Sequence, residues 1–401
     1  MKKLNIGLLP KIIIAIVLGV VLGFFLPTWS VRIFTTFNGI FSQFLNFFVP
    51  LIILGFVAPA IADLDSSAGK LLVLTVIIAY VSTVISGMLS YVTSSLVLPN
   101  FIFRDTSFTE AAASNALDPF FELKIPPMLD VLSAIVLAFA LGIGTSVIKG
   151  HTLKHFLFDF RGVIEMVVAK AIVPLLPLYI FGVFLKMSAA GTVMTLLTVF
   201  IKVIAMVVVM HFCWLILLFC FTGGITKRNP LALLGTMIPS WMTALGTQSS
   251  VATIPVNLKQ VRKLGVSDNV ADFVVPLCAT IHLSGSILQI TAFSVALMII
   301  QGMPHDFGTF AAFVMILGIT LVAAPGVPGG AIMASLGVLG SILGFSAGDQ
   351  ALMISLYVAV DSFGTATNVT GDGAVALLVD AFDKRERRRK VAAASSGKAT
   401  E

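Results

Sequence analysis

Two carboxylates near the C-terminus are the residues of this chain best placed to do chemistry. Asp361 and Asp372 are the only charges between residues 350 and 379, in a stretch that is otherwise long and apolar enough to span a bilayer. On a helix, Asp361, Thr365, Asn368 and Asp372 step by four, three and four residues, so they share one polar stripe. A carboxylate at membrane depth costs several kcal/mol unless it faces a cavity, an ion or a partner. The stripe therefore predicts a functional site.

The composition predicts the surroundings of this stripe. Of 401 residues, 58% are hydrophobic and 11% are charged, whereas about a quarter of an ordinary soluble domain is charged. The chain is therefore expected to be a polytopic membrane protein. Its net charge of +6 comes largely from the basic run at 384–390, which we interpret as a cytoplasmic anchor beside the anionic leaflet and not as a nucleic-acid site.

Enzymatic chemistry is disfavoured. The sequence contains no nucleophile–base set, no metal-ligating His/Cys cluster and no His-Glu-x-x-His motif. The three cysteines lie in apolar segments without metal-ligand spacing, as expected of small buried side chains.

Ten apolar regions must position the stripe. Eight have bilayer length, near 10–27, 38–61, 71–99, 129–149, 156–187, 192–222, 268–301 and 349–380. Two more, about 230–258 and 309–345, are broken near the middle by small and polar residues with a proline. Because lipid cannot satisfy the freed amides, each break predicts a re-entrant helical hairpin whose tip lies inside protein. Paired, interrupted segments are typical of transporters built on inverted repeats.

The distribution of Lys and Arg predicts an orientation. With the N-terminus in the cytoplasm, the outer loops keep only Arg32, Arg104, Lys124 and Lys186. Both termini are then cytoplasmic in a plasma (cell inner) membrane, and the loop 100–128 is external. The first hairpin opens from the cytoplasm and the second from outside, so their tips can meet near the midplane.

Three motifs carry a resemblance to a known family. They are Asn368-Val-Thr-Gly-Asp372 in the last span, Gln248-Ser-Ser-Val-Ala-Thr-Ile-Pro-Val256 in the first hairpin and Gly326-Val-Pro-Gly329 in the second. With them the chain resembles, over essentially its whole length, a divergent prokaryotic-like member of the glutamate-transporter family, the dicarboxylate/amino acid:cation symporters. The resemblance implies an all-α elevator-type transporter, a homotrimer in the bilayer, that couples an amino acid to a cation gradient. It assigns 1–70 and 100–190 to a scaffold, 71–99 and 191–383 to a transport domain, and 384–401 to a basic tail.

The resemblance also implies roles for single residues. Asp361 matches the acid that holds the α-amino group of the substrate, and Asn368 matches the amide that grips its α-carboxylate. The other implied substrate contacts are Ser249, Ser250, Val251, Ser286, Val327, Gly329, Gly364 and Thr365. The implied Na⁺ ligands are Asp372, Asn368, His282, Cys278, Thr280, Tyr80 and Thr83, since hard cations prefer oxygen donors. The implied gate residues are Pro325, Gly326, Pro328 and Gly330, where glycine lets the second hairpin bend over the ligand and reopen.

The departures from the family pattern bear on the substrate. The arginine that receives an acidic side chain falls on Gly364, and the arginine of some members falls on Gln248. Without a cation, a side-chain carboxylate would be buried unpaired. Gly364 is expected to leave room, so a neutral amino acid is favoured over glutamate and aspartate.

The seventh span departs as well. Where the family shows Asn-Met-Asp-Gly-Thr, this chain has His282-Leu-Ser-Gly-Ser286. The aspartate of one Na⁺ site has become Ser284, which predicts fewer coupled ions. His282 lies alone between Asp272 and Asp306 and ordinarily titrates near physiological pH. His211 in the sixth span is expected to be a packed polar residue.

These observations favour Na⁺-coupled symport of a neutral amino acid. The alternatives are a proton-coupled symporter of the same substrates that uses His282, and a carrier of dicarboxylates or other small organic anions. A channel lined by the hairpins and a sensor that binds without net flux also stay open.

Overall fold

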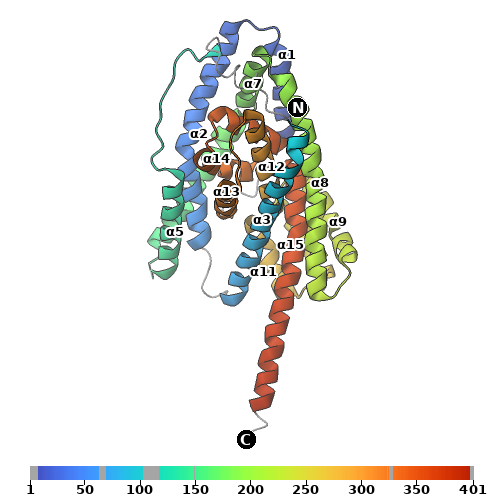
Figure 1. Cartoon of the computed structure of the whole chain (residues 1–401). Helices are drawn as coiled ribbons and strands as arrows, with labels where there is room; N and C mark the ends of the chain where they lie inside the picture. The colour runs from blue at the N-terminus through green and yellow to red at the C-terminus, as the bar shows by residue number, and fades with distance from the viewer. Residues whose placement is uncertain are drawn as a thin grey trace, which may run out of the picture.

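The chain is described by a computed structural model covering residues 8–62, 69–102, 117–148, 150–322, 324 and 328–397. Within these residues the regular elements are all helical (Figure 1). In chain order they are α1 (Leu8–Gly23), α2 (Thr28–Ala62), α3 (Gly69–Val97), α5 (Val131–Val147), α6 (Thr152–Val167), α7 (Val173–Ala189), α8 (Val193–Thr226), α9 (Pro230–Thr247), α10 (Ser250–Lys263), α11 (Asp268–Ile281), α12 (Ser284–Gln301), α13 (Phe307–Leu321), α14 (Gly330–Leu343) and α15 (Ala347–Gly397). A π-helical turn, Val168–Ile172, joins α6 to α7.

Several helices have the length and composition of membrane spans. Five stretches qualify in the described part, namely Thr28–Pro59, Leu71–Asn100, Thr152–Ala189, Leu196–Thr226 and Asp268–Gln301. Large apolar side chains are exposed on the outer helices, such as Ile13 on α1 and Val209 on α8. Contiguous exposed apolar surface of this kind suits lipid and not water. The protein is therefore a multi-pass membrane protein.

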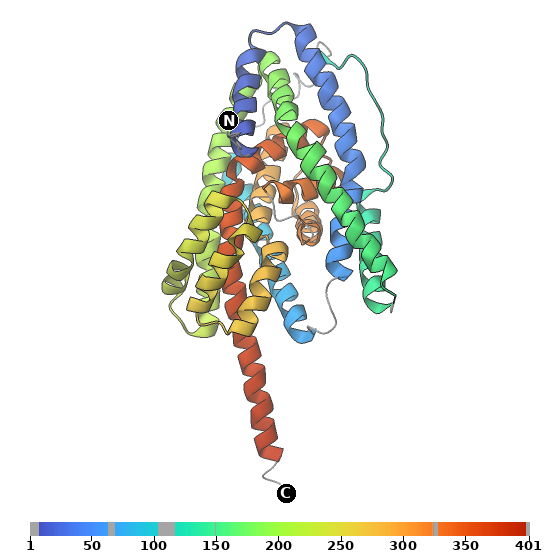
Figure 2. The same cartoon turned by 180° about the vertical axis from the view of Figure 1, so that it is seen from behind.

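Both predicted hairpins are helix pairs. The chain reverses between α9 and α10 and between α13 and α14, and the helices of each pair pack on each other (Figure 2). The first reversal falls within the predicted break at 246–255. It lies at Gln248 and Ser249, whereas Pro255 sits inside α10. Gln248 has a φ of 53°, a left-handed conformation that non-glycine residues rarely adopt.

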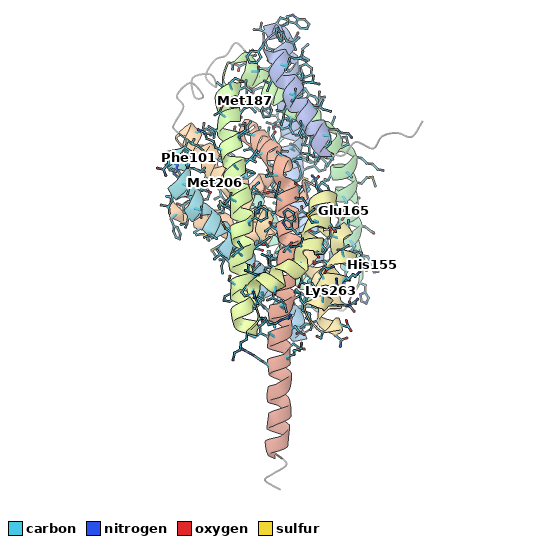
Figure 3. All side chains as sticks on the ribbon, turned by 90° about the vertical axis from the view of Figure 1, so that its right-hand side faces the viewer. Phe101, His155, Glu165, Met187, Met206 and Lys263 are labelled. Carbon is cyan, nitrogen blue, oxygen red and sulfur yellow. The ribbon has the colours of Figure 1, made fainter. Side chains whose placement is uncertain are left out.

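Two predicted spans differ from a single straight helix that ends with the span. The span at 268–301 is two helices, because α11 ends at Ile281 and α12 begins at Ser284. The last predicted span, 349–380, lies within α15, and this helix continues through the basic tail to Gly397, so that its end projects past the other helices (Figures 1 and 3). The residues after 380 are mostly charged or alanine, and such residues favour helix.

Helix packing brings the C-terminal helix to the centre of one group. The helices α8 to α12 pack around α15, and α3 packs on α12 and α13. The helices α2, α5 and α7 form a second set of contacts, with α1 against α7 (Figure 1). All of α12 from Ser284 to Ile300 is buried, so its polar side chains must find partners inside protein.

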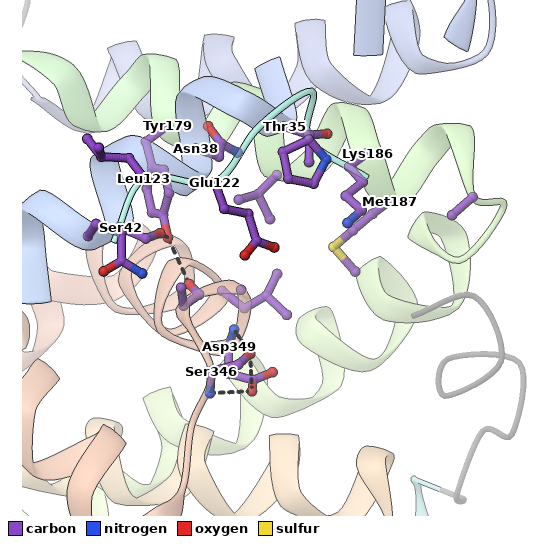
Figure 4. Close-up of a pocket in the computed structure, with 18 of the residues that line it drawn as sticks. Thr35, Asn38, Ser42, Glu122, Leu123, Tyr179, Lys186, Met187, Ser346 and Asp349 are labelled. Carbon is purple, nitrogen blue, oxygen red and sulfur yellow. Dashed lines mark hydrogen bonds between the residues drawn. The ribbon is translucent and has the colours of Figure 1, made fainter. Parts of the chain in front are cut away.

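A cavity of about 760 Å³ lies between α2, α7, the segment 119–124 and the turn before α15 (Figure 4). Tyr179 of α7 lines this cavity, and its hydroxyl donates to the Ala347 carbonyl at 2.8 Å. Ser42 of α2 lies 2.9 Å from the same hydroxyl. The contact ties α2 and α7 to the start of α15.

Candidate functional site

The predicted polar stripe is a buried face of α15. Asp361, Thr365, Asn368 and Asp372 are each no more than 6% exposed. Tyr357, four residues before Asp361, extends the stripe by one turn and is also buried. Carboxylates this deep need partners from neighbouring helices, and each acid has a different one.

Asp361 is bonded to the tip of the second hairpin. The backbone N–H of Gly329 donates to Asp361 Oδ2 at 2.7 Å, and the Thr365 hydroxyl donates to Oδ1 at 3.4 Å. Gly329 has a φ of 75°, which glycine adopts at little cost. Pro328 and Gly330 flank it, whereas the predicted residues Pro325, Gly326 and Val327 lie outside the described residues. The hairpin tip therefore supplies a direct partner to the first acid.

Asn368 is bonded to the start of α12. Its Oδ1 accepts from the N–H groups of Gly285 and Ser286, at 2.7 and 3.3 Å. Its Nδ2 donates to Ser286 Oγ at 3.0 Å, and Tyr357 donates to the same oxygen at 3.0 Å. The first amides of a helix have no intrahelical acceptor, so the break at 282–283 creates donors that Asn368 satisfies.

Asp372 is bonded to His282 at that same break. Their Oδ1 and Nδ1 atoms are 3.0 Å apart, and Ser82 Oγ of α3 lies 3.0 Å from His282 Nε2. The two ring nitrogens thus connect α15 to α3. The second oxygen of Asp372, Oδ2, is buried and has no hydrogen-bond partner in the described part of the chain. This arrangement offers one free anionic oxygen beside an imidazole.

The predicted cation ligands separate into two sets. Asp372 and His282 are in contact, with Cys278 buried close to Asp372. The predicted hydroxyl ligands instead donate hydrogen bonds to backbone carbonyls: Tyr80 to that of Met315, Thr83 to that of Ala79 and Thr280 to that of Leu277. The described residues contain no group of three or more His, Cys, Asp or Glu that could hold a metal ion. Asp372 is thus the acid of this set and His282 its direct partner.

The space expected at Gly364 is filled. A Cβ on this residue would lie 2.9 Å from Gln289 Oε1 and 3.0 Å from its Nε2. Gln289 belongs to α12, and His211 Nε2 of α8 lies 3.3 Å from its Oε1. The expectation that glycine leaves open room here is therefore wrong, because a neighbouring amide occupies that room.

The first hairpin reaches α15 beside the stripe. Ala244 of α9 packs with Ala366 and Val369, and Asn257 of α10 donates to the Val369 carbonyl at 3.1 Å. At the tip, the N–H of Ala252 donates to Ser249 Oγ, which caps α10. Ser250 is half-buried, and Val251 is 47% exposed.

Four residues of the site were not predicted from the sequence. They are Ser82, Gln289, Tyr357 and His211, the last as the partner of Gln289. Tyr357 carried a usable signal, since it continues the spacing of the stripe by one turn. Gln289 carried a weaker one, three residues after Ser286 in an apolar run. Ser82 carried none, because its partner is 200 residues away in the sequence.

Buried acids that meet a hairpin tip and a broken helix are typical of secondary transporters. Comparison with known proteins agrees. The chain belongs to the sodium:dicarboxylate symporter family, whose pattern matches residues 8–382. The protein is accordingly a membrane transporter and not an enzyme.

Named relatives span the chain. It is 26% identical over 396 residues to the serine/threonine transporter SstT of Acinetobacter baylyi, covering 95% of this chain and 98% of that one. The SstT protein of Acinetobacter baumannii is 27% identical over 399 residues, covering 96% and 98%. An excitatory amino acid transporter of Caenorhabditis elegans is 26% identical over 301 residues, covering 72% of this chain and 59% of the relative.

Proposed function

We propose that this protein is a secondary active transporter that carries a neutral amino acid into the cell together with Na⁺. The observation that carries the proposal is Asp361, a buried carboxylate whose main partner is the backbone N–H of a hairpin tip. The printed names of the relatives, serine/threonine transporter and excitatory amino acid transporter, support an amino acid as the substrate.

The amino and carboxylate groups of an amino acid fit two residues of the stripe, Asp361 and Asn368. An ammonium group would exchange with the Gly329 N–H and give Asp361 an opposite charge, which a buried carboxylate needs. Asn368 Nδ2 carries two hydrogens, of which one donates to Ser286. The second can donate to the α-carboxylate, assisted by amides of the first hairpin tip near Ser249.

A neutral side chain follows from the charges. Residues 203–226 of α8, all of α12 and residues 350–379 of α15 contain no Lys or Arg. A second substrate carboxylate would therefore lack a cation and would face two carboxylates already on α15. The burial cost of such a group argues against acidic amino acids and against dicarboxylates.

The second hairpin serves as the gate in this proposal. Its tip must release Asp361 before a substrate can enter or leave, and the left-handed Gly329 provides a backbone that bends there. Substrate binding and hairpin closure then compete for one carboxylate oxygen. This competition couples the presence of the ligand to the position of the gate.

Translocation is proposed to follow an elevator mechanism with eight spans and two re-entrant hairpins. Residues 71–99 and 191–383 form the moving body, and residues 1–70 and 100–190 form the scaffold of a homotrimer. The packing of α8 to α12 around α15 supports the first body. The cavity lined by α2, α7 and the turn before α15 supports a boundary between the two (Figure 4). Both termini lie in the cytoplasm in this arrangement of the cell inner membrane.

Asp372 is the anionic centre proposed for the coupling cation. Its free Oδ2 is a hard oxygen donor of the kind that Na⁺ prefers. A second candidate is H⁺, favoured by the contact of the other oxygen with His282. In that case the proton is shared between imidazole and carboxylate, with the Ser82 hydroxyl at the far nitrogen.

Uptake into proteoliposomes tests the proposal. The purified protein is given labelled neutral and acidic amino acids under an imposed Na⁺ gradient, an imposed pH gradient, or neither. Accumulation of a neutral amino acid with Na⁺ alone supports Na⁺ symport, and accumulation with the pH gradient alone supports the proton. If acidic amino acids are accumulated and neutral ones are not, the assignment of the substrate class is wrong.

A further inference from the structure

Gln289 contacts α15 between Asp361 and Asn368, the two residues proposed to bind the substrate. It is fully buried on α12 and follows Ser286 by three residues, so both point to the same side of that helix. Its amide lies directly over Gly364, whose added Cβ would be 2.9–3.0 Å away. Gly364 lies on α15 one turn after Asp361 and one turn before Asn368. With the α-amino group at Asp361 and the α-carboxylate at Asn368, as proposed above, the amide lies beside the side chain of the substrate.

The hydrogen bonding of this amide is incomplete. Its Oε1 lies 3.3 Å from His211 Nε2, while its Nε2 is buried and makes no hydrogen bond of normal geometry in the described part of the molecule, with the Tyr357 hydroxyl as a close polar neighbour of the amide. A fully buried amide donor left without an acceptor is unfavourable. If the two amide atoms are exchanged, the free atom is an oxygen, and a hydroxyl group can pair with either.

Ser286 offers a second donor beside it. Its Oγ accepts hydrogen bonds from Tyr357 and Asn368, which uses both lone pairs. The hydroxyl proton is then left to donate. Around these two side chains, α12 and residues 350–379 of α15 supply no positive charge. Gln289 and Ser286 therefore present hydrogen-bond donors without a cation beside them.

We infer that Gln289 sets the specificity of the transporter for the substrate side chain, and that this side chain carries a neutral oxygen, a hydroxyl or a carboxamide. The inference rests on the proposed function, because it places the α-amino group at Asp361 and the α-carboxylate at Asn368. An aliphatic side chain leaves the Gln289 donor unpaired, and a carboxylate finds no counter-charge. Because aliphatic and acidic side chains are both disfavoured, the site selects amino acids with a polar, neutral side chain.

Serine and alanine are the matched probes, because they differ by one hydroxyl. The quantity measured is the ratio of kcat/KM for serine to that for alanine in proteoliposomes. The wild-type protein is expected to favour serine, and Gln289→Leu is expected to lower the ratio by about 5–10-fold, the worth of one neutral hydrogen bond. Gln350→Leu is the control. Gln350 is also a buried glutamine, but it lies on α15 and its side chain donates to the Phe345 carbonyl. The Gln350→Leu variant should keep the wild-type ratio.

A second variant keeps the test decisive if Gln289→Leu does not fold. Gly364→Ala places a methyl group against the flexible end of Gln289, so the amide shifts while the rest of the site stays intact. It should lower the same ratio. An unchanged ratio in a folded Gln289→Leu or Gly364→Ala protein overturns the inference but leaves neutral amino acid transport standing. A wild-type protein that accumulates no neutral amino acid, with asparagine and glutamine tested beside serine and alanine, overturns the proposed function and the inference together.

Discussion

Removal of the His282 imidazole tests the buried contact at Asp372. In His282→Leu, Asp372 Oδ1 loses a partner 3.0 Å away, and Oδ2 has none to begin with in the described residues. The two side chains are 0% and 1% exposed, so water has little access to the carboxylate left behind. Breaking a buried pair by removing one partner costs about 3–5 kcal/mol, and a lost hydrogen bond to a charged group costs about 1.5–3 kcal/mol. We expect the free energy of unfolding to fall by about 3 kcal/mol.

The neighbours of the pair set the scale of this effect. Ser82→Ala removes a neutral hydroxyl from the other ring nitrogen and should cost about 1 kcal/mol. In the double variant His282→Leu/Asp372→Leu no charge remains at this pair, so it should be more stable than His282→Leu alone. Thr75→Val is the control, since Thr75 is also buried on α3 and, among the described residues, its hydroxyl bonds only to the Leu71 carbonyl of its own helix.

Denaturant unfolding in detergent micelles, followed by circular dichroism, measures these differences. The reasoning is refuted if His282→Leu unfolds within about 0.5 kcal/mol of Thr75→Val, the ordinary range of a change without structural consequence. It is also refuted if the double variant is less stable than His282→Leu. Either result means that Asp372 is neutral or is paired by something other than the imidazole.

Three further predictions concern single positions. Asp361→Asn keeps an acceptor for the Gly329 N–H but removes the charge, so the protein should fold and show no thermal shift with amino acids that shift the wild type. Gln248→Gly should raise the free energy of unfolding by about 1 kcal/mol, measured by denaturant titration, because the left-handed conformation suits glycine. The pKa of Asp306 is lowered by the hydroxyl and N–H of Thr309, so its contribution to stability is present above its unfolded pKa and lost as pH falls through the folded one. Asp306→Asn should remove that part of the acid dependence of the melting temperature.

The sequence predicted the helices and the polar stripe well because their signals are local. Apolar length identifies the spans, and the spacing of Asp361, Asn368 and Asp372 identifies one face of a single helix. The break inside the seventh span was not predicted. The run from Asp268 to Gln301 is apolar enough to cross a membrane as one helix, and only the partners of His282 and Ser286 on α15 show why the backbone opens there.

The contacts across the site could not be predicted from local patterns. The contact between Ser82 and His282 spans 200 residues, and the amide that fills the space at Gly364 comes from another helix. A glycine in a sequence shows that a side chain is missing. It does not show whether a ligand or a neighbour occupies the space. At Gly364 the space is filled by Gln289, so Gln289 and not the glycine is the residue that faces the proposed substrate.

The partners of the two acids indicate how ligand and ion could act on different parts of one site. Asp361 is bonded to a hairpin tip, whereas Asp372 is bonded to a side chain at a helix break between packed helices. A hairpin tip can move away and return, but His282 is held between α3 and α15 by bonds at both ring nitrogens. In the proposed mechanism, exchange at Asp361 therefore changes the gate, and exchange at Asp372 changes the packing of α3, α12 and α15. Because Asn368 lies between the acids and binds the first amides of α12, a shift of that helix reaches the substrate site through Asn368.

Asn368→Ala should thus weaken the dependence of amino acid affinity on the coupling ion as well as the affinity itself. Equal affinity losses with and without the ion would place Asn368 in substrate binding alone.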